Sequence, residues 1–204
     1  MARLPFRAPA DLPGAVAAAH EALAAHGVIA APTETFYGLS VDPADPVAVE
    51  RVLALKGRAG DRHLLVIGAS LEQLADLVEI RADLERWLRA IWPAPLSVVL
   101  PARRTLAAAG ATLAVRVPDH ALLRALLEWT GPLTSTSANR SGEPPAAAAD
   151  AVAAVFGERV DLLLDGGGTP GGLPSTLIDA TGNDLRVVRA GAWPTAPDGV
   201  VKRA

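Results

Sequence analysis

The sequence predicts an α/β protein in which helices pack on a mixed, twisted sheet. Two observations indicate this class. Short apolar runs of strand length alternate with Ala- and Leu-rich segments of helical period along the chain, and no internal repeat or linker divides its 204 residues. We therefore expect one domain over residues 1–190. From residue 191 the pattern fades into Trp, Pro, Gly and charged residues, which predicts a C-terminal tail over residues 191–204.

The first half of the chain carries clear helix and strand signals. Asp11 is placed to cap an Ala-rich helix that stops at Gly27, and Asp45 is placed to cap a second helix that has proline at its first position. Ser70 and Gln73 have the spacing of a capping box. We expect helices over about 11–26, 45–56, 70–77 and 84–91, strands over 28–31 and 64–67, and a polar turn over 33–39.

The second half continues this alternation. Asp119 opens a helix that we expect to run to about residue 129, and an Ala-rich helix follows over 146–156. Strands are expected over 96–100, 113–117, 133–135, 160–164, 175–179 and 185–189. The glycine-rich segment 166–172 lacks the Gly-Lys-Ser/Thr ending of a Walker motif and the Rossmann glycine spacing, so we interpret it as a flexible connection between strands.

Composition excludes several classes of function. The chain has no cysteine, which rules out disulfides, thiolate catalysis, Cys-ligated zinc and iron–sulfur clusters. The formal net charge of −3 disfavours non-specific nucleic-acid binding, although a local cationic groove is compatible with it. No secretory signal follows Met1, and no apolar run reaches the roughly 18 residues of a membrane span. We expect a soluble, cytoplasmic protein with no membrane partner.

Lys56 stands out because the chain otherwise uses arginine. Lys and Arg total 19, but the only lysines are Lys56 and Lys202. An ammonium is a compact point charge whereas guanidinium is a planar fork, so a lysine here suits crowded phosphate or carboxylate oxygens. Arg58 and Arg62 follow with two glycines, as in a loop that clamps a polyanion. On this segment alone, a solvated basic helix C-terminus is the simpler explanation.

Polar residues gather at strand and helix ends, where α/β folds bind their ligands. The four clusters are 33–35, 56–62, 135–139 and 174–176. Arg116 lies inside an apolar strand, and a buried arginine has an anionic partner, for which an ion pair within the protein and a ligand contact are equally compatible. Ser137 lacks the His-Asp pair and the glycines of a nucleophile elbow. Two of the histidines lie six residues apart on one predicted helix, too far to share a metal, and the other two are isolated, so we assign no triad and no metal-ligand role.

Six segments in this order resemble the YrdC-type L-threonylcarbamoyladenylate synthases, in the single-domain form. They span about residues 27–191 and are specific together, although each is weak alone. The segments are Pro32-Thr33-Glu34-Thr35-Phe36-Tyr37-Gly38-Leu39, Lys56-Gly57-Arg58, Trp92-Pro93-Ala94-Pro95-Leu96, Val115-Arg116-Val117-Pro118-Asp119-His120, Ser135-Thr136-Ser137-Ala138-Asn139 and Pro174-Ser175-Thr176.

The resemblance implies an open, twisted α/β fold around a large cationic cavity. It also implies a nucleotidyltransferase that joins L-threonine, bicarbonate or CO2, and ATP into threonylcarbamoyl-AMP and releases pyrophosphate. ATP enters as a substrate together with Mg²⁺, with no protein-ligated metal. The product feeds a threonylcarbamoyl transferase complex that modifies the adenosine beside the tRNA anticodon, and direct binding of tRNA is expected to be weak or absent.

Site residues follow from the resemblance position by position. Lys56 and Arg58 would be catalytic. ATP would be bound by Lys56, Arg58, Arg62, Thr112, Ser137, Asn139 and Arg189, and L-threonine by Thr35, Arg116, Ser135 and Ser175. The chain departs from the commonest family pattern at Ala59, at Arg62-His63 and at Ala94.

Two rival hypotheses remain. One is a paralogue of the same fold that lacks the Lys-x-Arg and Ser-x-Asn pairs, but both pairs are intact here. The other is a non-catalytic module that binds tRNA or double-stranded RNA through a basic cavity. The acidic net charge argues against an RNA module, and the salt dependence of tRNA binding separates it from an enzyme.

Overall fold

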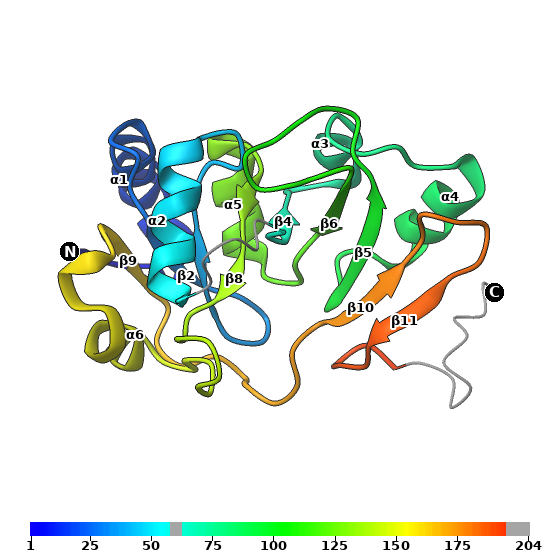
Figure 1. Cartoon of the computed structure of the whole chain (residues 1–204). Helices are drawn as coiled ribbons and strands as arrows, with labels where there is room; N and C mark the ends of the chain where they lie inside the picture. Colours follow the sequence, from blue (N-terminus) through cyan, green and yellow to red (C-terminus); the bar gives the residue numbers. More distant parts are fainter. Residues whose placement is uncertain (58–62, 195–204) are drawn as a thin grey trace.

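The structure, a computed structural model, describes residues 1–57 and 63–194 of the chain. Its strands form two open mixed sheets with helices packed against them, which confirms the predicted α/β class (Figure 1). The division into two sheets was not predicted from the sequence, because strand pairing is decided by contacts between distant segments. The predicted cationic loop at 58–62 and residues 195–204 of the predicted tail lie outside the described residues.

The first sheet has the strand order β1-β9-β2-β3-β8. Its strands are β1 (Ala2–Pro5), β2 (Ile29–Pro32), β3 (Tyr37–Ser40), β8 (Thr136–Ser137) and β9 (Leu162–Asp165). β9 pairs in parallel with both β1 and β2, whereas β3 is antiparallel to both β2 and β8.

The second sheet has the order β11-β10-β5-β6-β4-β7. Its strands are β4 (Val66–Ile67), β5 (Leu96–Pro101), β6 (Thr112–Arg116), β7 (Leu133–Thr134), β10 (Thr176–Asp179) and β11 (Arg186–Arg189). The chain passes from β7 of this sheet to β8 of the first sheet through Ser135 alone. The two sheets therefore meet at that residue.

The described helices lie between and around the two sheets (Figure 1). Among the described residues the α-helices are α1 (Leu12–Ala24), α2 (Pro46–Lys56), α3 (Leu71–Ala75), α4 (Ala82–Ile91), α5 (Ala121–Thr130) and α6 (Ala149–Phe156), and the 3-10 helices are η1 (Pro9–Asp11) and η2 (Gly157–Arg159). In this part of the chain, no helix is both long enough and apolar enough to cross a membrane.

The buried side chains form three cores. Along β9, Leu163 points into the core beneath α2 and α6, whereas Leu162 and Leu164 point into a core that α1 and α5 cover. Strands buried on both faces read as continuous apolar runs, which explains the uninterrupted sequence here. The second of these cores also contains Ile67 of β4 and Leu133 of β7, so it joins the two sheets. The third core lies between the second sheet and helices α3 and α4.

Helix ends confirm the local predictions in part. The Asp45 carboxylate accepts hydrogen bonds from the N–H groups of Val47 and Ala48, as predicted for a cap. Asp11 instead accepts from the N–H groups of Arg7 and Ala8 and fixes η1. The helix opened by Asp119 in the prediction begins after His120, whose Nδ1 accepts from the Leu123 N–H.

Three short strands were not predicted, and one helix stop was misplaced. β1 and β8 have no distinctive pattern, and β3 was assigned to the polar turn over 33–39. The left-handed residue after α1 is His26, with φ of 56°, rather than Gly27. Gly27 is needed for a different reason, since a Cβ there would lie 2.6 Å from the carbonyl oxygen of Ala22.

The glycine-rich connection runs from β9 of the first sheet to β10 of the second, and both of its ends are held. The Tyr37 hydroxyl donates to the carbonyl of Gly167 and accepts from the N–H of Gly166. The Gly171 N–H donates to the Thr35 carbonyl at 2.8 Å.

The start of the predicted C-terminal tail contacts the fold. Trp193 packs on the third core, and its carbonyl accepts a hydrogen bond from the Thr176 hydroxyl. The domain boundary at residue 190 stays a prediction.

We predict that Asp165→Asn destabilises the first sheet. Burial opposes ionisation of Asp165, but hydrogen bonds from Arg3, the Gly167 N–H and Arg7 outweigh it and lower the pKa to about 2. The free energy of unfolding should fall by about 1–3 kcal/mol, the value of charge-assisted hydrogen bonds. Wild-type protein should lose this stabilisation as pH falls from about 4 to about 2, because the unfolded state takes up the proton first.

Chemical denaturation at pH 7 and pH 3 measures both effects. Asp150→Asn is the matched control, since Asp150 pairs with the same Arg3 but is 86% exposed and should contribute little. Equal unfolding free energies for Asp165→Asn and wild-type protein would show that the N-terminal strand does not depend on this carboxylate.

Candidate functional site

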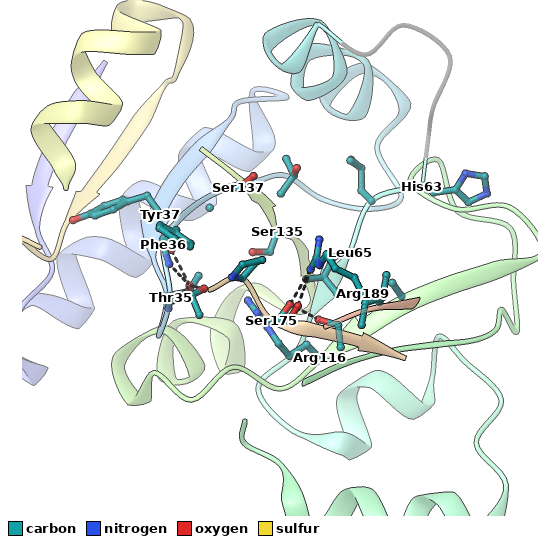
Figure 2. Close-up of a pocket in the computed structure, with 18 residues that line it drawn as sticks. Thr35, Phe36, Tyr37, His63, Leu65, Arg116, Ser135, Ser137, Ser175 and Arg189 are labelled. Atoms are coloured by element: carbon teal, nitrogen blue, oxygen red, sulfur yellow. Dashed lines mark hydrogen bonds between the residues drawn. The ribbon is translucent and has the colours of Figure 1, made fainter. Parts of the chain in front are cut away.

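A cavity of about 300 Å³ lies where the two sheets meet. Thr35 and Ser137 line it from the first sheet and its turn, and Arg116, Ser175 and Arg189 line it from the second. Ser135, the residue between the sheets, also lines it. Figure 2 shows these side chains converging from both sheets, with Arg189 bonded to Ser175. The cavity therefore carries hydroxyl groups and two guanidinium groups.

The crossing segment is fixed by hydrogen bonds on both sides. The Ser135 N–H donates to the Leu65 carbonyl at 2.7 Å, and the Thr134 N–H donates to the Val41 carbonyl at 2.9 Å. The Thr134 hydroxyl also accepts from the Val41 N–H. Gly38 lies directly opposite, where a Cβ would come within 2.8 Å of the Ser135 Oγ. This close approach lets β3 pack against the crossing.

Lys56 is a buried ammonium at the last position of α2. Its side chain is 2% exposed, which excludes the solvated helix end considered from sequence. Nζ donates to the Ser137 carbonyl at 2.5 Å and to Asn139 Oδ1 at 2.7 Å, and lies 3.3 Å from Ser137 Oγ. The Ser137 hydroxyl donates to the same Asn139 oxygen at 2.6 Å. Lys56 therefore joins α2 to the polar segment that leaves β8.

Arg116 and Glu34 form a buried ion pair, which supplies the anionic partner expected for Arg116. Nη1 of Arg116 lies 3.3 Å from Oε1 of Glu34, and their side chains are 4% and 10% exposed. Burial raises the pKa of Glu34 and outweighs the opposing effect of Arg116. Burial likewise lowers the pKa of Arg116, and nearby Arg189 lowers it further.

Ser175 is held between two side chains of the second sheet. Its Oγ lies 3.0 Å from the Ser97 Oγ, and Nη2 of Arg189 donates to its carbonyl at 2.8 Å. Burial lowers the pKa of Arg189. Arg116 is buried whereas Arg189 is exposed, so attraction for an anion is strengthened relative to water mainly at Arg116.

The remaining predicted residues lie at different distances from the cavity. Thr112 is on the same face of β6 as the cavity-lining Ala114 and Arg116, but does not line the cavity itself. Asn139 reaches the site through Ser137 and Lys56. Arg58 and Arg62 lie outside the described residues.

Sequence reasoning missed Glu34 and Ser97 as parts of the site. Ser97 interrupts the apolar run of β5, which is the same signal that identified Arg116. Glu34 lies inside the first motif segment, but its pairing with Arg116, 82 residues later in the chain, is tertiary information. His63 also lines the cavity. In the described ranges, no three His, Cys, Asp or Glu side chains are placed to hold a metal ion.

The chain matches the sequence model of one known protein family. The Sua5/YciO/YrdC family model, which carries the description Telomere recombination, matches residues 21–191. The chain belongs to this family.

Members of the Sua5/YciO/YrdC family are similar along most of the chain. The threonylcarbamoyl-AMP synthase of Chromohalobacter salexigens is 42% identical over 178 residues, 84% of this chain and 96% of that protein. The synthase of Idiomarina loihiensis is 39% identical over 82% of this chain and 94% of its own length. The synthase of Pyrococcus abyssi is 38% identical, and the matched region is only 51% of its length.

Solved structures of the Sua5/YciO/YrdC family share the fold. P. abyssi Sua5 complexed with L-threonine has a TM-score of 0.88 and 34% identity, covering 95% of this chain and 58% of that one. E. coli YciO has a TM-score of 0.81 and 25% identity, with coverage of 94% and 95%. The open two-sheet architecture is thus that of the family.

We predict that Gly191→Ala disturbs the Ser175 side of the site. A Cβ at residue 191 would lie 2.2 Å from the Pro174 carbonyl oxygen and 2.6 Å from backbone atoms of Ser175 and Thr176. Backbone must therefore move, which should cost about 1–3 kcal/mol of unfolding free energy, as overpacking does. Gly182→Ala is the control, because nothing lies within 4 Å of the added atom. Equal denaturation midpoints for the two variants would contradict this prediction.

Proposed function

We propose that this protein synthesises L-threonylcarbamoyladenylate from L-threonine, bicarbonate or CO2, and ATP, with release of pyrophosphate. This reaction is the first step of threonylcarbamoyladenosine modification beside the tRNA anticodon. One observation carries the proposal: four of the six motif segments line a single cavity between the sheets. The names of relatives that are 38–42% identical support it.

The second sheet and its neighbours suit the amino acid. We assign L-threonine to Thr35, Arg116, Ser135 and Ser175, with the Arg116 guanidinium on the substrate carboxylate. A guanidinium presents two parallel donors that match a carboxylate. The three hydroxyls offer donors and acceptors to the substrate's own polar groups. The complex of P. abyssi Sua5 with L-threonine supports this choice of ligand.

Groups at the end of α2 and on both sheets suit the nucleotide. We assign ATP to Lys56, Arg58, Arg62, Thr112, Ser137, Asn139 and Arg189, with Lys56 and Arg58 as the catalytic pair. The buried Lys56 ammonium holds Ser137 and Asn139 in place beside the cavity. Phosphate oxygens favour such a cluster of cationic and hydroxyl donors.

The chemistry needs positioning and charge stabilisation more than a side-chain base. The threonine amine attacks the carbon of CO2 and releases a proton to solvent, or attacks bicarbonate with loss of water, and either route gives a carbamate. A carbamate oxygen then attacks the α-phosphorus in line, and the bond to the pyrophosphate oxygen breaks. Transfer of this kind depends on alignment and on cations beside the developing charge, which the guanidinium and ammonium groups supply.

The proposed reaction implies the partners of the protein and its location in the cell. We propose that ATP enters as its Mg²⁺ complex, with the metal carried by the phosphates. The product passes to a threonylcarbamoyl transferase complex acting on tRNA in the cytoplasm. Bare tRNA should bind weakly, because the net charge is −3 and the cations assigned to the substrates, such as Arg116 and Arg189, line a cavity rather than an extended surface. Residues 1–190 act as the catalytic domain in this proposal.

The products formed from ATP test the function directly. Threonylcarbamoyl-AMP and pyrophosphate should appear only when L-threonine, bicarbonate and ATP are all present, and chromatography of labelled nucleotide measures both. Equal release of pyrophosphate without threonine would overturn the assignment. L-serine in place of the substrate L-threonine is the matched control, because it lacks only the methyl group.

We predict that Lys56→Arg loses most activity although the charge is kept. Among the described residues, three oxygens converge on the Lys56 nitrogen at 2.5–3.3 Å, and a planar guanidinium cannot place its donors in that space without moving Ser137 or Asn139. Such movement should remove about one charge-assisted contact to the transferring phosphate, worth about 2–4 kcal/mol of barrier by analogy with oxyanion donors, so kcat/KM should fall on the order of a hundredfold. Circular dichroism should report an intact fold.

Arg51→Lys is the matched control for this exchange. Arg51 lies on the same helix, but its guanidinium contacts the His26 carbonyl and Asp161 rather than the site. This variant should keep activity within about threefold of wild type. A Lys56→Arg enzyme with equal activity would show that any cation serves at the end of α2.

A further inference from the structure

Glu34 is a buried carboxylate that the proposed reaction does not use. It lies in the turn between β2 and β3. Thr33 shapes this turn, because its hydroxyl accepts from the N–H groups of Thr35 and Phe36 and donates to the Phe36 carbonyl. The Glu34 side chain is thus not required for the turn. Burial of a carboxylate costs free energy, so its position calls for another explanation.

Glu34 reaches the cavity only through Arg116. Arg116 lines the cavity, whereas Glu34 pairs with it and is not among the lining residues. Within the described residues, no hydrogen bond is made by either carboxylate oxygen of Glu34 or by the Nε of Arg116. The interaction between the two side chains is therefore mainly electrostatic. Glu34 therefore influences a bound ligand through Arg116 and does not contact the ligand directly.

The Glu34 carboxylate offsets the repulsion between the guanidinium groups of Arg116 and Arg189. Arg189 is the second guanidinium on the cavity, and it lies close enough to lower the pKa of Arg116. Removing Glu34 would leave the buried Arg116 guanidinium and the exposed Arg189 facing one cavity without that carboxylate. Such an arrangement favours rotation of one side chain away from the other. Arg116 would then lose its fixed orientation.

We propose that Glu34 is a positioning residue that sets the affinity for the substrate amino acid by fixing Arg116 against its carboxylate. The inference rests on the proposed function, which places the threonine carboxylate on Arg116. In the bound state the guanidinium lies between two carboxylates, one from the protein and one from the ligand. The ligand also screens the repulsion between Arg116 and Arg189, so Glu34 and substrate act together on the same cation.

Among the residues that the structure describes, the charged groups that face Glu34 are Arg116 on β6, Asp119 after that strand and Arg124 on α5. Burial and then Asp119 raise the pKa of Glu34, while the two arginines oppose them. As pH falls through this raised pKa, Glu34 is neutralised and L-threonine affinity should fall. Above it, affinity should be constant. Glu34→Gln lacks the titrating group, so its affinity should not change over the same interval.

Calorimetric titration with L-threonine tests the inference without relying on catalysis. Glu34→Gln should raise Kd by roughly tenfold to a hundredfold, the effect of one charge-assisted contact. Glu34→Asp, which keeps the charge, should recover part of the affinity. In an Arg116→Gln background, the further change Glu34→Gln should have no additional effect, because Glu34 acts through Arg116.

Asp119→Asn is the matched control. It removes one negative charge near the same pair, but Asp119 is 63% exposed and pairs with Arg124, so Kd should stay within about threefold. A Glu34→Gln protein with wild-type Kd, or effects that multiply in the double variant, would overturn the inference. A merely structural role would lower the melting temperature without raising Kd. Wild-type protein that binds threonine but makes no threonylcarbamoyl-AMP would overturn the function and leave this inference standing.

Discussion

The passage of the chain between two sheets at Ser135 is the constraint on which the site depends. β7 and β8 are two residues long, so neither strand could hold its position alone. Backbone hydrogen bonds to Leu65 and Val41 fix the crossing from both sides, and Lys56 fixes the segment that follows. Since one sheet supplies Thr35 and Ser137 and the other supplies Arg116, Ser175 and Arg189, any movement here would separate the two halves of the cavity.

The electrostatics of the protein are divided between its surface and its cavity. The chain is acidic overall, with 22 acidic against 19 basic residues, yet the cavity carries two guanidinium groups and one buried carboxylate behind them. Exposed charges are screened over about a Debye length, whereas partly buried ones are screened much less. The local field, rather than the net charge, therefore determines what the cavity attracts.

The sequence predicted the elements whose causes are local. Asp45 and the proline after it specify the start of α2, and Gly57 ends it in a left-handed conformation with φ of 67°. β3 and β8 could not be predicted, because β3 is defined by its pairing with β2 and β8, and β8 by its pairing with β3. The same holds for the site: the polar segments were recognisable by motif, and buried Arg116 required an anion, but only the fold could identify Glu34 as that anion.

The use of lysine at residue 56 has a geometric explanation in the structure. With two lysines among 19 basic residues, the chain has 17 arginines, so composition alone would favour arginine. Three oxygens of Ser137 and Asn139 lie within 3.3 Å of a single nitrogen. An ammonium directs its three donors from one atom, whereas guanidinium spreads five donors over a plane several ångströms wide. Where a carboxylate is to be bound, as we propose for Arg116, the planar group is the better choice. At these two positions the kind of cation thus follows the shape of its partner, because the charge is the same for both.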